Sequence, residues 1–192
     1  MKREAKILLI ADNIWLFGEG MLGPLLAVFA QRIGGDILQI TWAWATYLMV
    51  QGVLAIFIGR YFDRLKRKSS KEALMLIGFI INAVFTFGYI FVHSTFSLLL
   101  VEVGLGVAAA LATPTWDALY AMHTEERKNE GLSWGLEDGL SQISTGLAIV
   151  VGGFIVSRGS FNLLFVTMGI LQIIATIVQF RILRSKRRLS VL

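Results

Sequence analysis

Apolar residues occur along the chain in six long runs, which short polar or charged segments separate. The runs cover residues 7–30, 37–58, 73–93, 95–122, 133–156 and 161–182. Each run is long enough to cross a membrane as a helix, because a helix rises about 1.5 Å per residue and the hydrocarbon core of a bilayer is about 30 Å thick. The pattern predicts an all-α membrane protein in which residues 1–192 form one domain of six transmembrane helices.

Composition supports a membrane protein. Hydrophobic residues make up 56% of the chain and charged residues only 16%, whereas charged residues are about 25% of a typical soluble domain. Cysteine is absent, so the chain has no disulfide and no cysteine-based nucleophile or metal site. We expect His93 and His123 at opposite membrane edges, where they cannot share a metal ion. The sequence predicts no metal, no cofactor and no enzyme, because no nucleophile and base occur together.

The positive charges predict the orientation in the membrane. All Lys and Arg residues except Arg32 and Arg158 lie at the amino end, after the second run, after the fourth run or in the carboxyl tail. Basic residues concentrate on the cytoplasmic side of membrane proteins. We therefore expect both termini to be cytoplasmic, in the inner or plasma membrane. The cations lie beside spans without an interleaved binding module, so no nucleic acid is expected.

Residues 59–68, between the second and third runs, read Gly-Arg-Tyr-Phe-Asp-Arg-Leu-Lys-Arg-Lys. The segment resembles the signature loop of the major facilitator superfamily, G-x-x-x-D-[RK]-x-G-[RK]-[RK], which joins helices 2 and 3 of each half. The matching residues are Gly59, Asp63, Arg64, Arg67 and Lys68, whereas Lys66 replaces the usual second glycine. The resemblance implies half of a major facilitator fold, built from 3+3 inverted repeats and most like the amino-terminal half.

Two other segments depart from patterns of this family. In the fourth run, Gly104, Gly106, Ala108 and Ala109 match a G-x-G-x-A-A pattern, but Leu100 stands where the family has an arginine. The fifth run contains two adjacent glycines, at 152 and 153, without the glycine-proline pair of the antiporter motif. The coupling role that the family attaches to that arginine therefore cannot be carried over, and the absence of the glycine-proline pair weakens an assignment to the drug:proton antiporters.

Acidic residues inside the runs are the candidate pathway residues. A carboxylate near the bilayer centre costs roughly 3 kcal/mol on insertion scales, so it usually faces a cavity or a partner. Glu19 is the deepest, and Asp12, seven residues earlier, shares its face of the helix. The resemblance implies that helices 1 and 4 line the pathway, which places Glu19 and Glu102 along it. Glu19 would carry a proton or attract a cationic substrate, or it would be a structural acid bonded to backbone or to Asn13.

Three further acids, Asp117, Glu137 and Asp138, are expected near the cytoplasmic face. The resemblance implies that they form a gate with the basic signature segment. For Glu137 and Asp138 there is also a structural alternative, because acids in the first turns of a helix complement its dipole.

Other residues in the runs are expected to have structural roles. The glycines of the first, fourth and fifth runs predict close helix packing. We interpret Trp42, Trp44 and Tyr47 as residues at the membrane interface. Most of the polar residues of the spans, which include Asn82, Thr86 and Gln172, are expected to form interhelical hydrogen bonds.

The length of the chain predicts an assembly. A complete transporter of this family has two six-helix halves related by an axis along the membrane normal, and this chain has the length of one half. We expect a parallel homodimer, whose twofold symmetry is the commonest among homo-oligomers, or an amino-terminal half that needs a complementary half. The resemblance implies proton-coupled transport of a small molecule by alternating access. The alternative is a non-transporting half that regulates a partner transporter.

Overall fold

The computed structural model describes residues 3–124 and 130–187, and no strand occurs in these two ranges. The helices are α1 (Arg3–Gly20), α2 (Leu25–Arg32), α3 (Ile37–Arg64), α4 (Lys68–Gly88), the short 3₁₀ helix η1 (Tyr89–Phe91), α5 (Thr95–Thr124), α6 (Glu130–Arg158) and α7 (Phe161–Arg187). Five spans are long and apolar enough to cross a membrane, and the pair α1 and α2 would be a sixth.

The first span differs from the single helix expected over 7–30. It is broken between α1 and α2, whose axes differ in direction by 44°. Pro24 lies just before α2. It explains the break, because proline has no N–H to donate and its ring clashes with the carbonyl four residues earlier, at Gly20. The break leaves Glu19 in the last turn of α1, where its carbonyl accepts a hydrogen bond from Leu22.

The signature segment also differs from the expected loop. The second span was expected to end at residue 58, but α3 continues to Arg64. Only residues 65–67 connect it to α4, which begins at Lys68. Gly59 is a helical residue, and Gly34 is the one described residue with a positive φ. The first six residues of the segment therefore continue the helix instead of forming a loop, and Phe62 among them is buried in the core.

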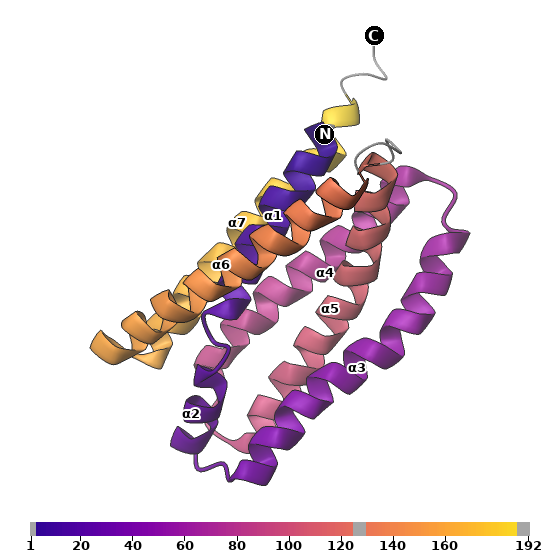
Figure 1. Cartoon of the computed structure of the whole chain (residues 1–192). Helices are drawn as coiled ribbons and strands as arrows, with labels where there is room; N and C mark the ends of the chain where they lie inside the picture. Colours follow the sequence, from indigo (N-terminus) through magenta and orange to yellow (C-terminus); the bar gives the residue numbers. More distant parts are fainter. Residues whose placement is uncertain (1–2, 125–129, 188–192) are drawn as a thin grey trace.

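The helices form one bundle, in which α4 and α7 pack against each other (Figure 1). On one side α5 packs against α3 and α4, and on the other side α1 packs against α6 and α7. The start of α1, the end of α7 and the connection between α3 and α4 lie at the same end of the bundle (Figure 1). We call this the terminal end.

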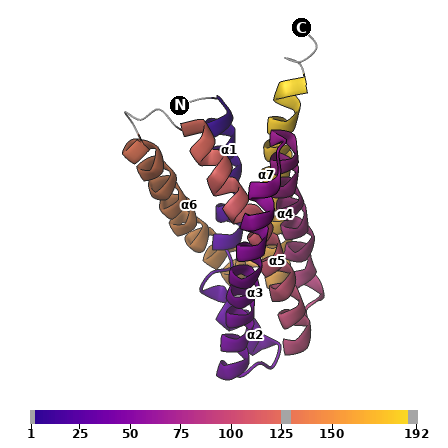
Figure 2. The same cartoon turned by 90° about the vertical axis from the view of Figure 1, so that its right-hand side faces the viewer.

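Helices α3 and α6 have little packing within the chain. Only 6% of the most apolar window of α3 is buried, and 11% of that of α6, compared with 56% for α5. Figure 2 shows both helices at the outside of the bundle. The exposed apolar surfaces of these two helices are available to lipid or to a partner chain.

Glycines allow the close helix contacts that the sequence predicts. A Cβ at Gly106 would lie 2.8 Å from the backbone oxygen of Tyr47, so α3 and α5 approach closely there. A Cβ at Gly152 would overlap the backbone of Met21, where α6 passes the break in the first span. At Gly153, nothing lies within 4 Å of such a Cβ. The close-packing prediction therefore holds for Gly106 and Gly152, but not for Gly153.

The contact at Gly152 predicts a loss of stability for Gly152→Ala. Overpacking costs about 1–3 kcal/mol, which exceeds the gain of about 1 kcal/mol that alanine brings in a helix. We expect a lower thermal unfolding midpoint in detergent for Gly152→Ala. The control is Gly131→Ala in the same helix, where nothing lies within 4 Å of the added Cβ. Equal midpoints for the two variants would contradict the packing of α6 on the break.

Candidate functional site

Glu19 lies at the centre of a polar cluster formed by three helices. Its Oε1 accepts a hydrogen bond of 2.5 Å from Trp15 Nε1, one turn earlier on α1. Asn82 of α4, with its amide nitrogen turned toward Glu19, donates to the same oxygen at 3.1 Å and accepts from Trp15 Nε1 at 2.8 Å. Gln172 of α7 donates to the backbone oxygen of Trp15 at 3.0 Å.

This cluster fixes the position of the Glu19 side chain. Asn82 and Gln172 are each only 1% exposed, and a buried polar group without a partner is costly. Their hydrogen bonds therefore hold α1, α4 and α7 in one arrangement. The expectation that Asn82 and Gln172 form interhelical hydrogen bonds is confirmed.

Glu102 of α5 forms a second anchored carboxylate. It is 2% exposed, and its Oε1 accepts a hydrogen bond of 2.8 Å from the hydroxyl of Tyr89 in η1. The donors to Glu19 and Glu102 are all neutral N–H and O–H groups. Neither carboxylate forms an ion pair with a described residue.

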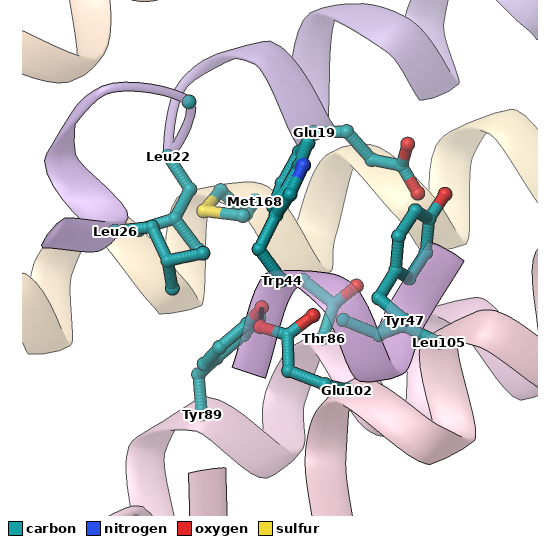
Figure 3. A pocket seen from close by; sticks show the side chains of 11 residues that line it. Glu19, Leu22, Leu26, Trp44, Tyr47, Thr86, Tyr89, Glu102, Leu105 and Met168 are labelled. Carbon is teal, nitrogen blue, oxygen red and sulfur yellow. Dashed lines mark hydrogen bonds between the residues drawn. The ribbon is translucent and has the colours of Figure 1, made fainter. Parts of the chain in front are cut away.

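The two carboxylates line one cavity of about 100 Å³, which we call the Glu102 cavity. Figure 3 shows its lining: the carboxylates come from α1 and α5, Trp44 and Tyr47 from α3, and Tyr89 from η1. The other lining residues are Leu22, Gly23, Leu26, Thr86, Leu105 and Met168. The site is thus a mostly apolar space with two acids and three aromatic rings.

A second cavity of about 260 Å³, the Asp117 cavity, also has Glu19 and Tyr47 in its lining. Asp12 of α1, Asp117 of α5 and Glu137 of α6 contribute further carboxylates to it. Asp12 and Glu19 thus line one cavity, as their spacing of seven residues indicates. Because Glu19 and Tyr47 line both cavities, they lie where the two spaces meet.

The acids of the two cavities have no basic neighbour in the cavity walls. The lining residues include five carboxylates, Asp12, Glu19, Glu102, Asp117 and Glu137, but no Lys, Arg or His. Within residues 3–124 and 130–187, no group of three His, Asp or Glu side chains is arranged to hold a metal ion. The arrangement suits reversible protonation or the binding of a positively charged group.

Other candidate residues lie apart from the Glu102 cavity. Asn13 faces α6, where it accepts a hydrogen bond of 2.6 Å from Ser144 and donates to the backbone oxygen of Leu9. It does not contact Glu19, so the alternative of a Glu19–Asn13 bond is wrong. Asp138 is exposed on α6.

The signature residues occupy the terminal end of the bundle. Gly59, Asp63 and Arg64 belong to the last turns of α3, and Arg67 immediately precedes α4. Lys68, the first residue of α4, lies with its Nζ 2.5 Å from Nε2 of His123. The structure brings Asp117 and Glu137 to the Asp117 cavity, whose lining includes none of these signature residues.

Sequence reasoning missed several residues of the site. Trp44 and Tyr47 were interpreted as interface residues, but they line the Glu102 cavity. Trp15 lies four residues before Glu19, a spacing that places both on one helix face and could have identified it. Tyr89 had no local signal, because its bond to Glu102 depends on how η1 meets α5.

Comparison with known proteins agrees with this architecture. The family model of the Major Facilitator Superfamily matches residues 8–191, almost the whole chain. The chain therefore belongs to the major facilitator superfamily, a family of transporters, and is an integral membrane protein. An uncharacterized MFS-type transporter of Methanocaldococcus jannaschii is 22% identical over 180 residues, which are 94% of this chain and 45% of that protein. The chain spans about half the length of this relative.

The polar cluster predicts that Asn82→Ala is destabilising. The change removes a donor to Glu19 and an acceptor for Trp15, and an unsatisfied buried group costs about 1–3 kcal/mol. We expect a lower thermal midpoint in detergent than for the control Asn162→Ala, at an exposed position of α7. A double-mutant cycle with Glu19→Gln should give a non-additive effect if the two side chains interact. Additive losses would contradict the bond between them.

Proposed function

We propose that this chain is one half of a secondary active transporter that moves a small solute by alternating access with proton coupling. The observation that carries the proposal is the pair of carboxylates, Glu19 and Glu102, in one cavity of a membrane bundle without a cationic partner in its walls. Burying a carboxylate in a membrane is costly, so such a residue usually serves a pathway or a proton relay. Protonation would remove that cost and change the state of the gate.

The break in the first span supports alternating access. Irregular backbone at membrane depth occurs where it is covered by protein or lines a cavity. Leu22 and Gly23, within the break, line the Glu102 cavity. Broken helices beside a binding site are common in secondary transporters. A rocking motion at this break would move Glu19 relative to α5.

Helix packing supports the 3+3 arrangement of the fold. The packing of α5 on α3 and α4 has its counterpart in the packing of α1 on α6 and α7, and α4 and α7 contact each other between them. Exchanging the first three spans with the last three reproduces these main contacts, although α6 also packs on α7 and α3 has no comparable contact with α4. This is the relation expected of two repeats within one half.

The poorly packed helices support association with a second copy. On α3, Gly52 and Gly59 lie two turns apart, and nothing lies within 4 Å of a Cβ at either position. The same holds for Gly135, Gly139, Gly146 and Gly153 of α6. Small residues mark helix contacts in membranes. We propose a parallel homodimer in which α3 of one copy packs against α6 of the other.

A second possible arrangement is a pair of this chain with a different six-helix half, and the length of the relative favours it. Since the chain corresponds to 45% of the length of the M. jannaschii protein, a complementary six-helix half would complete the pathway equally well. A half that regulates another transporter without transporting would also need this surface, but it would not need the two carboxylates.

The signature segment is the proposed cytoplasmic gate. Asp63 of one copy would approach the start of α6 in the other, where free N–H groups and the positive end of the helix dipole favour an anion. Its exposure, and that of Arg64 and Arg67, leaves these side chains available to a partner. Arg64 would pair with Asp117, or with Glu137 or Asp138, when the gate closes.

The proposal predicts that Glu19→Gln abolishes coupled transport, because glutamine keeps the size of the side chain but cannot exchange a proton. Proteoliposomes containing a trapped pH dye would be screened with small cationic, neutral and anionic solutes. We expect at least one solute to change the internal pH with the unaltered chain, and none to do so with Glu19→Gln. Glu4→Gln, near the start of α1, is the matched control. Equal solute-driven pH changes in Glu19→Gln and the unaltered chain would remove Glu19 from the mechanism.

The distribution of basic residues supports a cytoplasmic location for both termini, in the inner or plasma membrane. The chain has no native cysteine, so single cysteines can report its orientation. In intact cells, an impermeant maleimide should label Gln31→Cys at the far end from the termini, but not Ser69→Cys beside the signature segment. The reverse labelling pattern would contradict this orientation.

A further inference from the structure

The open oxygens of the two carboxylates indicate what the Glu102 cavity binds. Glu19 and Glu102 each accept their hydrogen bonds at Oε1. No described residue donates to the other oxygen of either side chain. The negative charge of each group is therefore oriented by neutral donors but not neutralised by the protein.

Thr86 is an independent polar group in the same cavity. Its side chain is 1% exposed, lines the cavity and forms no hydrogen bond with a described residue. Figure 3 shows its hydroxyl on the side of the cavity where Glu102 and Tyr47 lie. With no hydrogen-bond partner among the described residues, this hydroxyl can donate to or accept from a ligand in the cavity.

Aromatic rings form much of the remaining wall. Trp44, Tyr47 and Tyr89 line the cavity, and the rings of Trp44 and Tyr47 lie 5.8 Å apart between centroids. The faces of aromatic rings attract cations, most strongly in a desolvated site, and such cages bind quaternary ammonium groups. The Glu102 cavity, at about 100 Å³, is smaller than an engineered cavity of about 150 Å³ that holds benzene, so a ligand headgroup there would have to be compact.

We propose that the Glu102 cavity binds the ammonium headgroup of a small organic cation, attracted by the charge of the carboxylates and by the faces of the aromatic rings, with the Thr86 hydroxyl bonding to a polar group beside the headgroup. This inference rests on the proposed function, because it names the substrate class of that same site. The five carboxylates that line the two cavities would repel an anion. A sugar would need more hydroxyl and amide partners than the mostly apolar wall offers.

The test uses choline and its neutral isostere 3,3-dimethyl-1-butanol, which differ in charge but hardly in shape. Binding of each radiolabelled probe to the purified full chain in lipid nanodiscs would be measured by equilibrium dialysis. We expect choline to bind at least about tenfold more tightly than the alcohol, because only choline gains the cation–π and charge contacts of the cavity. Equal affinities, or no saturable binding of choline, would overturn the proposal.

Variants locate the binding to this cavity. Glu102→Gln and Thr86→Val should each weaken choline binding several-fold, whereas the controls Glu4→Gln and Thr41→Val should not. Thr41 is exposed on α3, and its hydroxyl bonds to the backbone oxygen of Ile37. If Glu102→Gln fails to fold, Trp44→Leu still tests whether choline occupies this cavity, through its aromatic wall, because Trp44 is 51% exposed and its replacement should be tolerated. Choline binding that none of the cavity variants weakens would overturn the assignment.

Transport of choline separates this inference from the proposed function. Charge-selective binding without choline flux into proteoliposomes would support the cation site and contradict the carrier function. Coupled transport of neutral or anionic solutes, without preference for choline over its isostere, would support the carrier function and contradict the cation site.

Discussion

The cost of placing charge and free backbone groups in a membrane is the constraint on which this structure depends. Pro24 interrupts the first span, and the chain covers the interruption by packing α6 against it at Gly152. The same interruption leaves Glu19 at the end of α1, beside both cavities. Trp15 and Asn82 then hold its carboxylate with neutral donors. These neutral donors orient the carboxyl group, and no described residue places an opposite charge against it.

The sequence predicted those features that depend on local spacing. The hydrophobic runs correspond to five helices long and apolar enough to cross a membrane and to the bent pair α1 and α2, and helical periodicity placed Asp12 and Glu19 on one face. Prediction from the sequence failed for features that depend on how the helices pack. The signature segment was expected to form a loop, but its first residues continue α3. Asn13 is adjacent to Asp12 in the chain, yet its side chain meets Ser144 of α6. Which helix a given face meets is a property of the whole bundle, which no short pattern encodes.

Helices α3 and α6 contribute residues to the walls of the two cavities. Helices α3 and α6 bury little of their apolar surface, and each carries glycines that contact nothing within the chain. Glu102 is enclosed, while Glu19 is only half-buried. These features agree with a half site, in which one wall of the pathway is present with its acids in place. A second set of helices would complete the enclosure and exclude lipid from the carboxylates.

The central claim is that this chain is half of a transporter whose pathway a second copy completes. The most direct test is the mass of the purified full chain in lipid nanodiscs, measured by native mass spectrometry after ejection from the lipid. The account predicts a species with twice the mass of the chain, at a protein-to-nanodisc ratio too low for chance pairing. A strictly monomeric protein under these conditions would contradict the homodimer.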